Sequence, residues 1–127
     1  MYKNIKTFED ACKIKNLDPT ALPDVSMLPE EHRASIINYY KLIIIASAIN
    51  GDWKPNWNNF SKRKYFPWFK VLADDSTPSG SALAYGGYCC VDSHSLVGSR
   101  LVFKTEEQAV YAGTQFIDYY KEYILIS

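Results

Sequence analysis

The residues best suited to binding chemistry lie in one stretch of the chain, from Trp53 to Lys70. This stretch holds seven of the nineteen aromatic residues, including every tryptophan, together with five lysine or arginine residues. Aromatic rings stack on nucleic-acid bases and cations contact phosphates, so the mixture is typical of a surface that binds single-stranded nucleic acid. The same residue types form hot spots at protein interfaces, and aromatic rings also fill the cores of small domains.

The predicted binding residues are the three tryptophans and five nearby or later cations. They are Trp53, Trp57, Lys62, Arg63, Lys64, Trp68, Lys70 and Arg100. Strand alternation would put Trp68 and Lys70 on one face, with Tyr65 and Phe69 on the other, so only some of the rings can be exposed together. A structure that buried all three tryptophans in the core would overturn the prediction of a working surface here.

The charge of the chain is balanced in total but uneven in its distribution. The net charge is zero, which removes the global basic field that steers most non-specific DNA binders. Residues 51–73 hold five cations against Asp52 alone, whereas residues 74–127 hold three cations and seven acids. This division predicts either a basic patch on a neutral protein or two regions that neutralise each other across the fold.

Residue types that support catalysis or metal binding are sparse. Cys89, Cys90 and His94 are the only close group of metal-ligating types, and they lack the second pair that zinc sites usually have. Neighbouring residues of a strand also point to opposite faces. The glycines match neither type of phosphate-binding loop. We therefore predict a protein that is not an enzyme and has no metal or other cofactor.

The cysteine count and the hydropathy pattern indicate the compartment. Three cysteines are an odd number, and two of them are adjacent, which favours a reducing environment. Residues 1–6 are too polar for a signal peptide, and the longest apolar run, residues 42–46, is far shorter than the ~20 residues of a membrane span. The sequence predicts a cytoplasmic protein without a membrane partner.

The first half of the chain predicts two helices joined by an irregular connector. A length of 127 residues fits one globular domain over residues 1–127. Thr7 followed by Asp10 predicts the start of a short helix that ends near residue 16. Residues 18–29 contain three prolines, and we expect their apolar side chains to pin this connector to the core. A buried helix should follow from Pro29 to about residue 50.

The second half predicts strands followed by a helix. Residues 65–72, 82–91 and 96–104 are rich in β-branched and aromatic side chains, so we expect a three-stranded antiparallel β-meander. Pro67 favours an edge strand or a bulge. Thr105 and Gln108 match a capping box that begins a last helix. The predicted class is α+β, with the meander packed against helices in the order α-α-β-β-β-α.

Six stretches of the chain carry a resemblance to a group of known proteins: residues 22–25 (Leu-Pro-Asp-Val), 39–41 (Tyr-Tyr-Lys), 53–57, 65–69 (Tyr-Phe-Pro-Trp-Phe), 98–104 and 112–116. Together they resemble small uncharacterised proteins encoded by phages and prophages of gut Bacteroidales, including crAss-like phages. The resemblance implies a protein made in the cytoplasm of the bacterial host that acts on phage nucleic acid, in particle assembly or on a host protein. The chain departs from the resemblance at residues 81–84, where relatives alternate glycine and aromatic residues.

These observations predict a non-enzymatic binding or assembly module of phage or prophage origin. Its aromatic-basic surface is expected to bind a protein partner, which is a second copy, a phage protein or a host protein. The alternative is a single-stranded nucleic acid, bound by stacking aromatics and by Lys and Arg side chains. The neutral net charge favours the protein partner slightly, and the salt dependence of binding separates the two, because phosphate contacts weaken steeply with salt.

Overall fold

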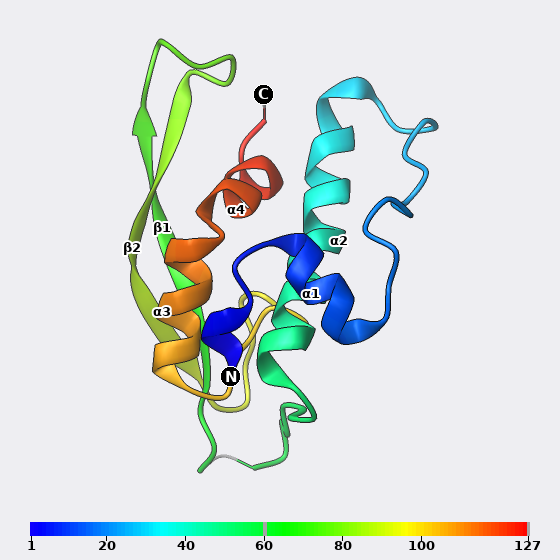
Figure 1. The fold of residues 1–127 in the computed structure, drawn as a ribbon. Coiled ribbons are helices and arrows are strands. Elements are labelled where there is room, and N and C mark those ends of the chain that lie inside the picture. Colours follow the sequence, from blue (N-terminus) through cyan, green and yellow to red (C-terminus); the bar gives the residue numbers. More distant parts are fainter. Residues whose placement is uncertain (60, 127) are drawn as a thin grey trace.

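The computed structural model of the chain describes residues 1–59 and 61–126 and has the predicted α+β class. A 3-10 helix opens the chain and is followed by two α-helices, a β-hairpin and two further α-helices (Figure 1). In chain order these are η1 (Tyr2–Asn4), α1 (Phe8–Lys15), α2 (Glu30–Asn50), β1 (Lys64–Ala73), β2 (Ser81–Val91), α3 (Glu106–Gln115) and α4 (Ile117–Ile124).

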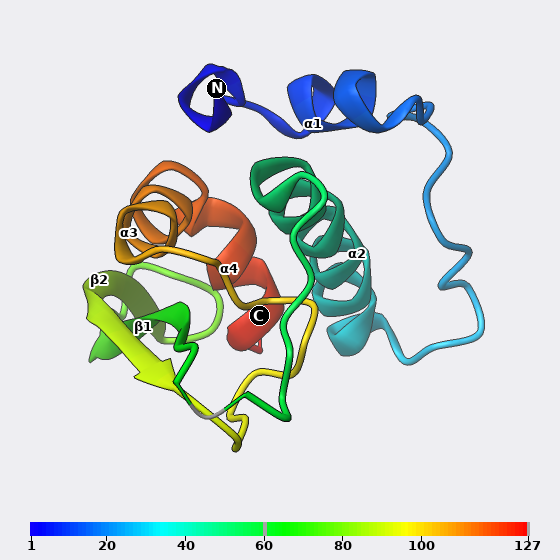
Figure 2. The ribbon, with the colours of Figure 1, turned by 90° about the horizontal axis from the view of Figure 1, so that it is seen from below.

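The elements stack in layers beside the hairpin. β1 and β2 pair antiparallel, from Lys64 opposite Val91 to Ala73 opposite Ser81. α3 and α4 lie along one side of this two-stranded sheet, α2 packs against α4, and α1 packs across α2, as Figure 2 shows from below. The opposite face of the hairpin has no helix over it among the described residues (Figure 2).

The sheet has two strands in the described part of the chain. The prediction of a third strand over residues 96–104 was therefore wrong. That segment contributes only an isolated bridge between Phe103 and Tyr65. Leu101, Val102 and Phe103 are buried in succession, whereas a strand on one face of a sheet alternates buried and exposed residues. The apolar composition of this segment therefore reflects enclosure by the core on several sides.

The helix boundaries follow the predicted local signals. The hydroxyl of Thr7 accepts from the backbone N–H of Asp10, and the Asp10 side chain accepts in return, which completes a capping box. Thr105 and Gln108 form the same reciprocal pair at the start of α3. α2 ends at Asn50, and Gly51 caps it with a φ of 61°, a conformation that glycine adopts without strain.

The last helix is divided in two, whereas the sequence predicted a single helix that begins at Thr105. Phe116 has φ −113° and ψ 26° and separates α3 from α4. Its ring is buried in the core. The change of direction lets Tyr120 of α4 reach Phe69 of β1, with 4.8 Å between ring centroids. α4 also accepts a hydrogen bond at the Tyr123 carbonyl from the Ser35 hydroxyl of α2, at 2.7 Å.

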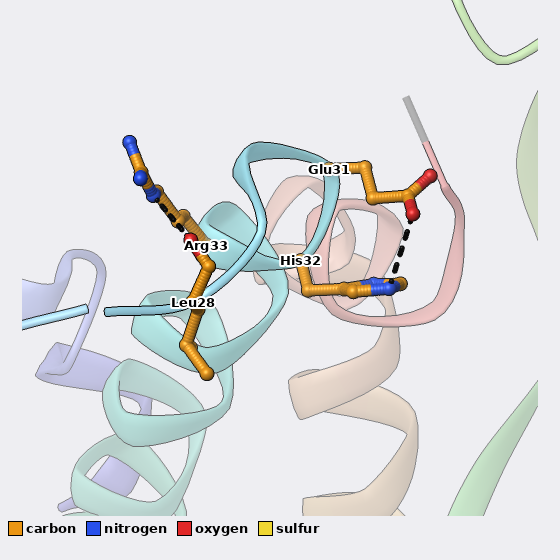
Figure 3. A network of polar contacts seen from close by, with 4 residues as sticks. All are labelled: Leu28, Glu31, His32 and Arg33. Carbon is orange, nitrogen blue, oxygen red and sulfur yellow. Dashed lines mark hydrogen bonds and ion pairs between the residues drawn. The ribbon is translucent and has the colours of Figure 1, made fainter. Parts of the chain in front are cut away.

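The connector between α1 and α2 does not enter the core, contrary to the prediction. No residue of the range 17–29 is buried, and Met27 is 88% exposed. Arg33 holds the connector instead, because its guanidinium donates to the carbonyls of Leu28 and Ser26 at 2.9 and 3.1 Å; Figure 3 shows the first of these bonds. Hydrogen bonds to backbone groups, together with the partial burial of Val25 and Leu28, therefore hold this segment.

Gly113 sets how closely α3 approaches the sheet. A Cβ at this position would lie 2.6 Å from the Cβ of Pro67 and 2.9 Å from Cε1 of Tyr85. Both distances are shorter than carbon atoms tolerate, and both neighbours belong to the paired strands. The absence of a side chain at Gly113 therefore allows the helix and the sheet to touch.

We expect Gly113→Ala to destabilise the protein by about 1–3 kcal/mol, because overpacking at this contact outweighs the gain in helix propensity. Urea unfolding followed by circular dichroism measures the change. Thr114→Ala, at the exposed neighbouring position, serves as the control and should change stability little. An unchanged or more stable Gly113→Ala variant would contradict the described packing.

Asp10 makes the stability of the N-terminal helix depend on pH. The backbone N–H of Lys6, 2.9 Å from Oδ2, and the bonds with Thr7 lower the pKa of the Asp10 carboxyl. A lowered folded-state pKa adds stability that is present above the unfolded value of about 3.9 and is lost as pH falls through the folded value.

We expect Asp10→Ala to be less stable than the wild type at neutral pH and this difference to shrink in acid. Urea unfolding at neutral and at acid pH measures the free energy of unfolding of each protein, with Glu9→Ala as the control variant. A stability difference between Asp10→Ala and the wild type that does not depend on pH would contradict this role of Asp10.

Candidate functional site

The predicted aromatic-basic stretch begins in a folded loop between α2 and β1, residues 51–63. Two asparagine turns shape this loop. Asn56 Oδ1 accepts from the backbone N–H of Asn58 at 3.0 Å, and Asn59 Oδ1 accepts from the backbone N–H of Ser61 at 3.1 Å. Such turns are what short polar side chains stabilise. Phe60 lies outside the described residues.

Lys64 fastens this loop to the rest of the protein. Its side chain is fully buried, and its Nζ donates to the Asp92 carbonyl at 2.6 Å and to the Asn59 carbonyl at 3.4 Å. The same Nζ lies 5.0 Å from the centroid of the Trp57 ring, a distance at which a cation is attracted to the face of a ring. No carboxylate pairs with Lys64 in the described residues. Lys64 therefore acts as a tether, which we call the Lys64 tether.

Trp57 uses both its ring face and its N–H inside the protein. Lys64 contacts the face, and Nε1 donates to the Ser99 hydroxyl at 2.7 Å. Ser99 precedes Arg100 in the segment between β2 and α3. Trp57 is half-buried, so its ring joins the loop to the segment that carries Arg100.

A basic groove lies along the loop and the start of β1. It is a hollow of about 700 Å³, and its walls contain five cations but no Asp or Glu among the residues that the structure describes. Lys54, Lys62, Arg63 and Lys104 are exposed, whereas the fifth cation of the walls, Lys64, is buried. The basic groove is formed by Trp53, Lys54, Asn56, Asn59, Ser61, Lys62, Arg63, Lys64, Tyr65 and Lys104.

A second hollow adjoins the basic groove and shares Trp53 and Lys54 with it. This Trp53 hollow has a volume of about 410 Å³ and also contains no acidic side chain from the described part of the chain. Asn50 fixes one wall, because its Nδ2 donates to the Val102 carbonyl at 2.9 Å. The Trp53 hollow is formed by Ile43, Ile44, Ser47, Asn50, Gly51, Trp53, Lys54, Pro55, Ser99 and Arg100.

The structure brings six of the eight predicted residues to this end of the molecule and places two elsewhere. The six are Trp53, Trp57, Lys62, Arg63, Lys64 and Arg100. Within this group Trp57 and Lys64 support the surface from inside. Trp68 and Lys70 lie further along β1, where both side chains are exposed. All three tryptophans retain exposure, so none is a fully buried core residue.

Trp68 is positioned by a glycine pair on the opposite strand. Its ring occupies the space in which a Cβ of Gly86 would lie, and a Cβ of Gly87 would be 3.2 Å from the ring. The strand register shifts between Trp68 and Phe69. A register shift and a close contact of a ring with the backbone are both typical of glycines within a strand. The ring stays 43% exposed.

Two cations of the basic groove were not among the predicted site residues. Lys54 lies beside Trp53 in the same aromatic-basic stretch, so its proximity was visible in the sequence. Lys104 reaches the groove because Phe103, its neighbour, bridges to Tyr65 at the start of β1. A single bridge of this kind leaves no periodic pattern, so the sequence carried no signal for Lys104.

We expect the Lys64 tether to control the order of the loop. Lys64→Met keeps the length and burial of the side chain but removes the bonds to the Asn59 and Asp92 carbonyls. Hydrogen exchange at the amides of Asn59 and Lys62, which are bonded within the loop, should accelerate about tenfold. Lys62→Met, at an exposed position, is the matched control. Equal exchange in both variants would mean that Lys64 does not hold the loop.

Comparison of the chain with models of protein families, with curated proteins and with solved structures finds no match. No helix in the part of the chain that the structure describes has the length and apolar character needed to cross a membrane. The same residues contain no group of three or more His, Cys, Asp or Glu side chains placed to hold a metal ion.

Proposed function

We propose that the protein is a non-enzymatic binding module whose basic groove and Trp53 hollow bind single-stranded nucleic acid. One observation carries this proposal: two adjoining hollows share Trp53 and Lys54 and have cations but no carboxylates in the described parts of their walls. This arrangement combines a path for phosphates with a ring for a base, which is how sequence-tolerant single-strand binders work.

The local charge supports this proposal although the net charge of the chain is zero. Lys54, Lys62, Arg63 and Lys104 are exposed around one hollow, and no carboxylate forms an ion pair with them among the described residues. Unpaired cations in a concave surface concentrate positive potential there and attract a polyanion. A strand laid along the groove would release counterions from its phosphates, which drives binding at low salt.

The tether supports the proposal in a second way, because it pre-organises the surface. The Nζ of Lys64 bonds the loop and the segment after β2 at the same time, so a ligand would not have to order them. Binding to a surface that is already ordered loses less entropy. We also propose the setting that the sequence resemblance implies, a phage or prophage protein that acts in the cytoplasm of its bacterial host.

A protein partner is the second candidate, and a different surface favours it. Trp68, Val71 and Leu72 of β1 are large hydrophobic residues that are exposed, with 43%, 57% and 48% of their surfaces accessible. Tryptophan is enriched among the hot spots of protein interfaces. The two partner classes of the sequence prediction therefore correspond to two surfaces, one at the loops and one along the hairpin.

The nucleic-acid proposal is tested by fluorescence anisotropy with labelled single-stranded DNA and RNA at two salt concentrations. We expect binding that weakens with salt, with a slope of about −0.7 in log–log form for each phosphate contacted. The double variant Lys62→Glu/Arg63→Glu should bind at least about tenfold more weakly at low salt, because two contacts become repulsive.

The double variant Lys13→Glu/Lys15→Glu, at exposed positions of α1, makes the same change in net charge away from the groove and should bind normally. Equal losses in both double variants would show that net charge alone attracts the ligand and would contradict a groove site.

Trp53→Ala separates stacking from charge. A stacked ring contributes about 1–3 kcal/mol per base, so this variant should bind about tenfold more weakly at either salt concentration. Trp68→Ala removes a ring of the same type outside the two hollows and should leave the affinity for single strands unchanged. A larger loss of affinity in Trp68→Ala than in Trp53→Ala would contradict a site in the two hollows and would indicate a site on the hairpin.

A further inference from the structure

One edge of the hairpin is open for most of its length. The backbone N–H and C=O of Tyr65 both bond to Phe103, at 3.0 and 2.7 Å, on the side of β1 opposite to β2. The extra residue at the register shift is Gly86 of β2, so β1 itself keeps its alternation. In an antiparallel strand every second residue directs its backbone groups to the same edge, so those of Phe69 and Val71 point there too. Beyond the Tyr65 bridge, no described residue pairs with this edge.

An apolar hollow of about 210 Å³ runs beside this open edge. β1 supplies most of one wall, and α4 together with the segment before α3 supplies the rest. The edge hollow is formed by Phe66, Pro67, Trp68, Phe69, Val71, Leu83, Val97, Leu101, Tyr120, Tyr123 and Ile124. It contains no charged side chain among the residues described, so it differs in chemistry from the basic groove.

We propose that this edge binds an extended segment of a protein partner, which adds a third strand to the hairpin beside β1. Strand addition supplies backbone hydrogen bonds for affinity, and alternate side chains of the added strand supply specificity. The proposal rests on the second candidate function, the protein partner. It gives that partner a mode of binding and a chemistry that the exposure of Trp68 alone does not define.

Pro67 and Lys70 define what the added strand must look like. Pro67 offers only a carbonyl to the edge, because proline has no N–H, so full pairing starts at Phe69. Lys70 is exposed on the face away from the helices and has no carboxylate partner among the described residues. A matching strand therefore carries apolar side chains toward α4 and an acidic side chain beside Lys70.

The charge at Lys70 also favours a different chain over a second copy. If β1 of two copies paired antiparallel, both Lys70 side chains would lie on the same face of the joined sheet, within a few residues of each other. Like charges at such short separations across a sheet are destabilising. An acidic partner strand makes the opposite contact, so charge complementarity selects it.

The test uses a soluble peptide of alternating valine and glutamate as the probe, with alternating valine and lysine as its control. We expect the acidic peptide to bind and to slow hydrogen exchange at the amides of Phe69 and Val71. Val71→Pro removes an edge-directed N–H from a position of the same register as Pro67 and should weaken binding about tenfold or more. Val71→Thr keeps the N–H and should bind within about twofold of the wild type.

Three results would overturn the proposal: no binding of the acidic peptide at millimolar concentration, equal binding of both variants, or exchange at Phe69 and Val71 that the peptide does not change. A dimer of the free protein that Val71→Pro dissociates would also overturn it, because the occupant would then be a second copy. Single-strand binding by Val71→Pro should equal that of the wild type, so failure of this proposal is distinguishable from failure of the nucleic-acid proposal.

Discussion

The surface at the loop end of the molecule depends on one buried ammonium group. Lys64 has no accessible surface and no carboxylate partner in the described chain, and an unpaired buried charge is costly unless polar groups satisfy it. Two backbone carbonyls and the face of Trp57 do so here. Because these groups come from two different loops, stabilising the charge requires both loops to stay in place.

The position of this ammonium explains why the cations gather on one side. Lys64 opens β1, and the bridge between Tyr65 and Phe103 follows at once. The loop before β1 and the segment after β2 therefore meet at the same end of the hairpin. Residues far apart in sequence, such as Lys62 and Lys104, become neighbours around one groove, and a neutral chain acquires a basic face.

Much of the local structure was predictable because its signals are local. Both capping boxes and the glycine after α2 appear where short-range hydrogen bonding requires those residue types. The grouping of Trp53, Lys62 and Arg63 was predictable for the same reason, since they share one loop.

The sequence predictions failed where tertiary contacts determine the conformation or the exposure of a residue. Leu101 to Phe103 has strand composition but is enclosed by the core, and nothing in the local pattern distinguishes the two cases. Lys64 belongs to a run of three cations, and only the folded structure separates it from its two exposed neighbours. Trp68 belongs to the same aromatic stretch as Trp53, yet strand geometry places it on another surface.

The most direct test of the central claim is nuclear magnetic resonance of isotope-labelled protein titrated with a single-stranded oligothymidylate. If the tethered loops form the nucleic-acid surface, changes in amide chemical shift should concentrate at Trp53, Lys54, Lys62, Arg63 and Arg100. They should leave the amides of Phe69 and Val71 unchanged. Changes confined to the hairpin, or no changes at all, would contradict it.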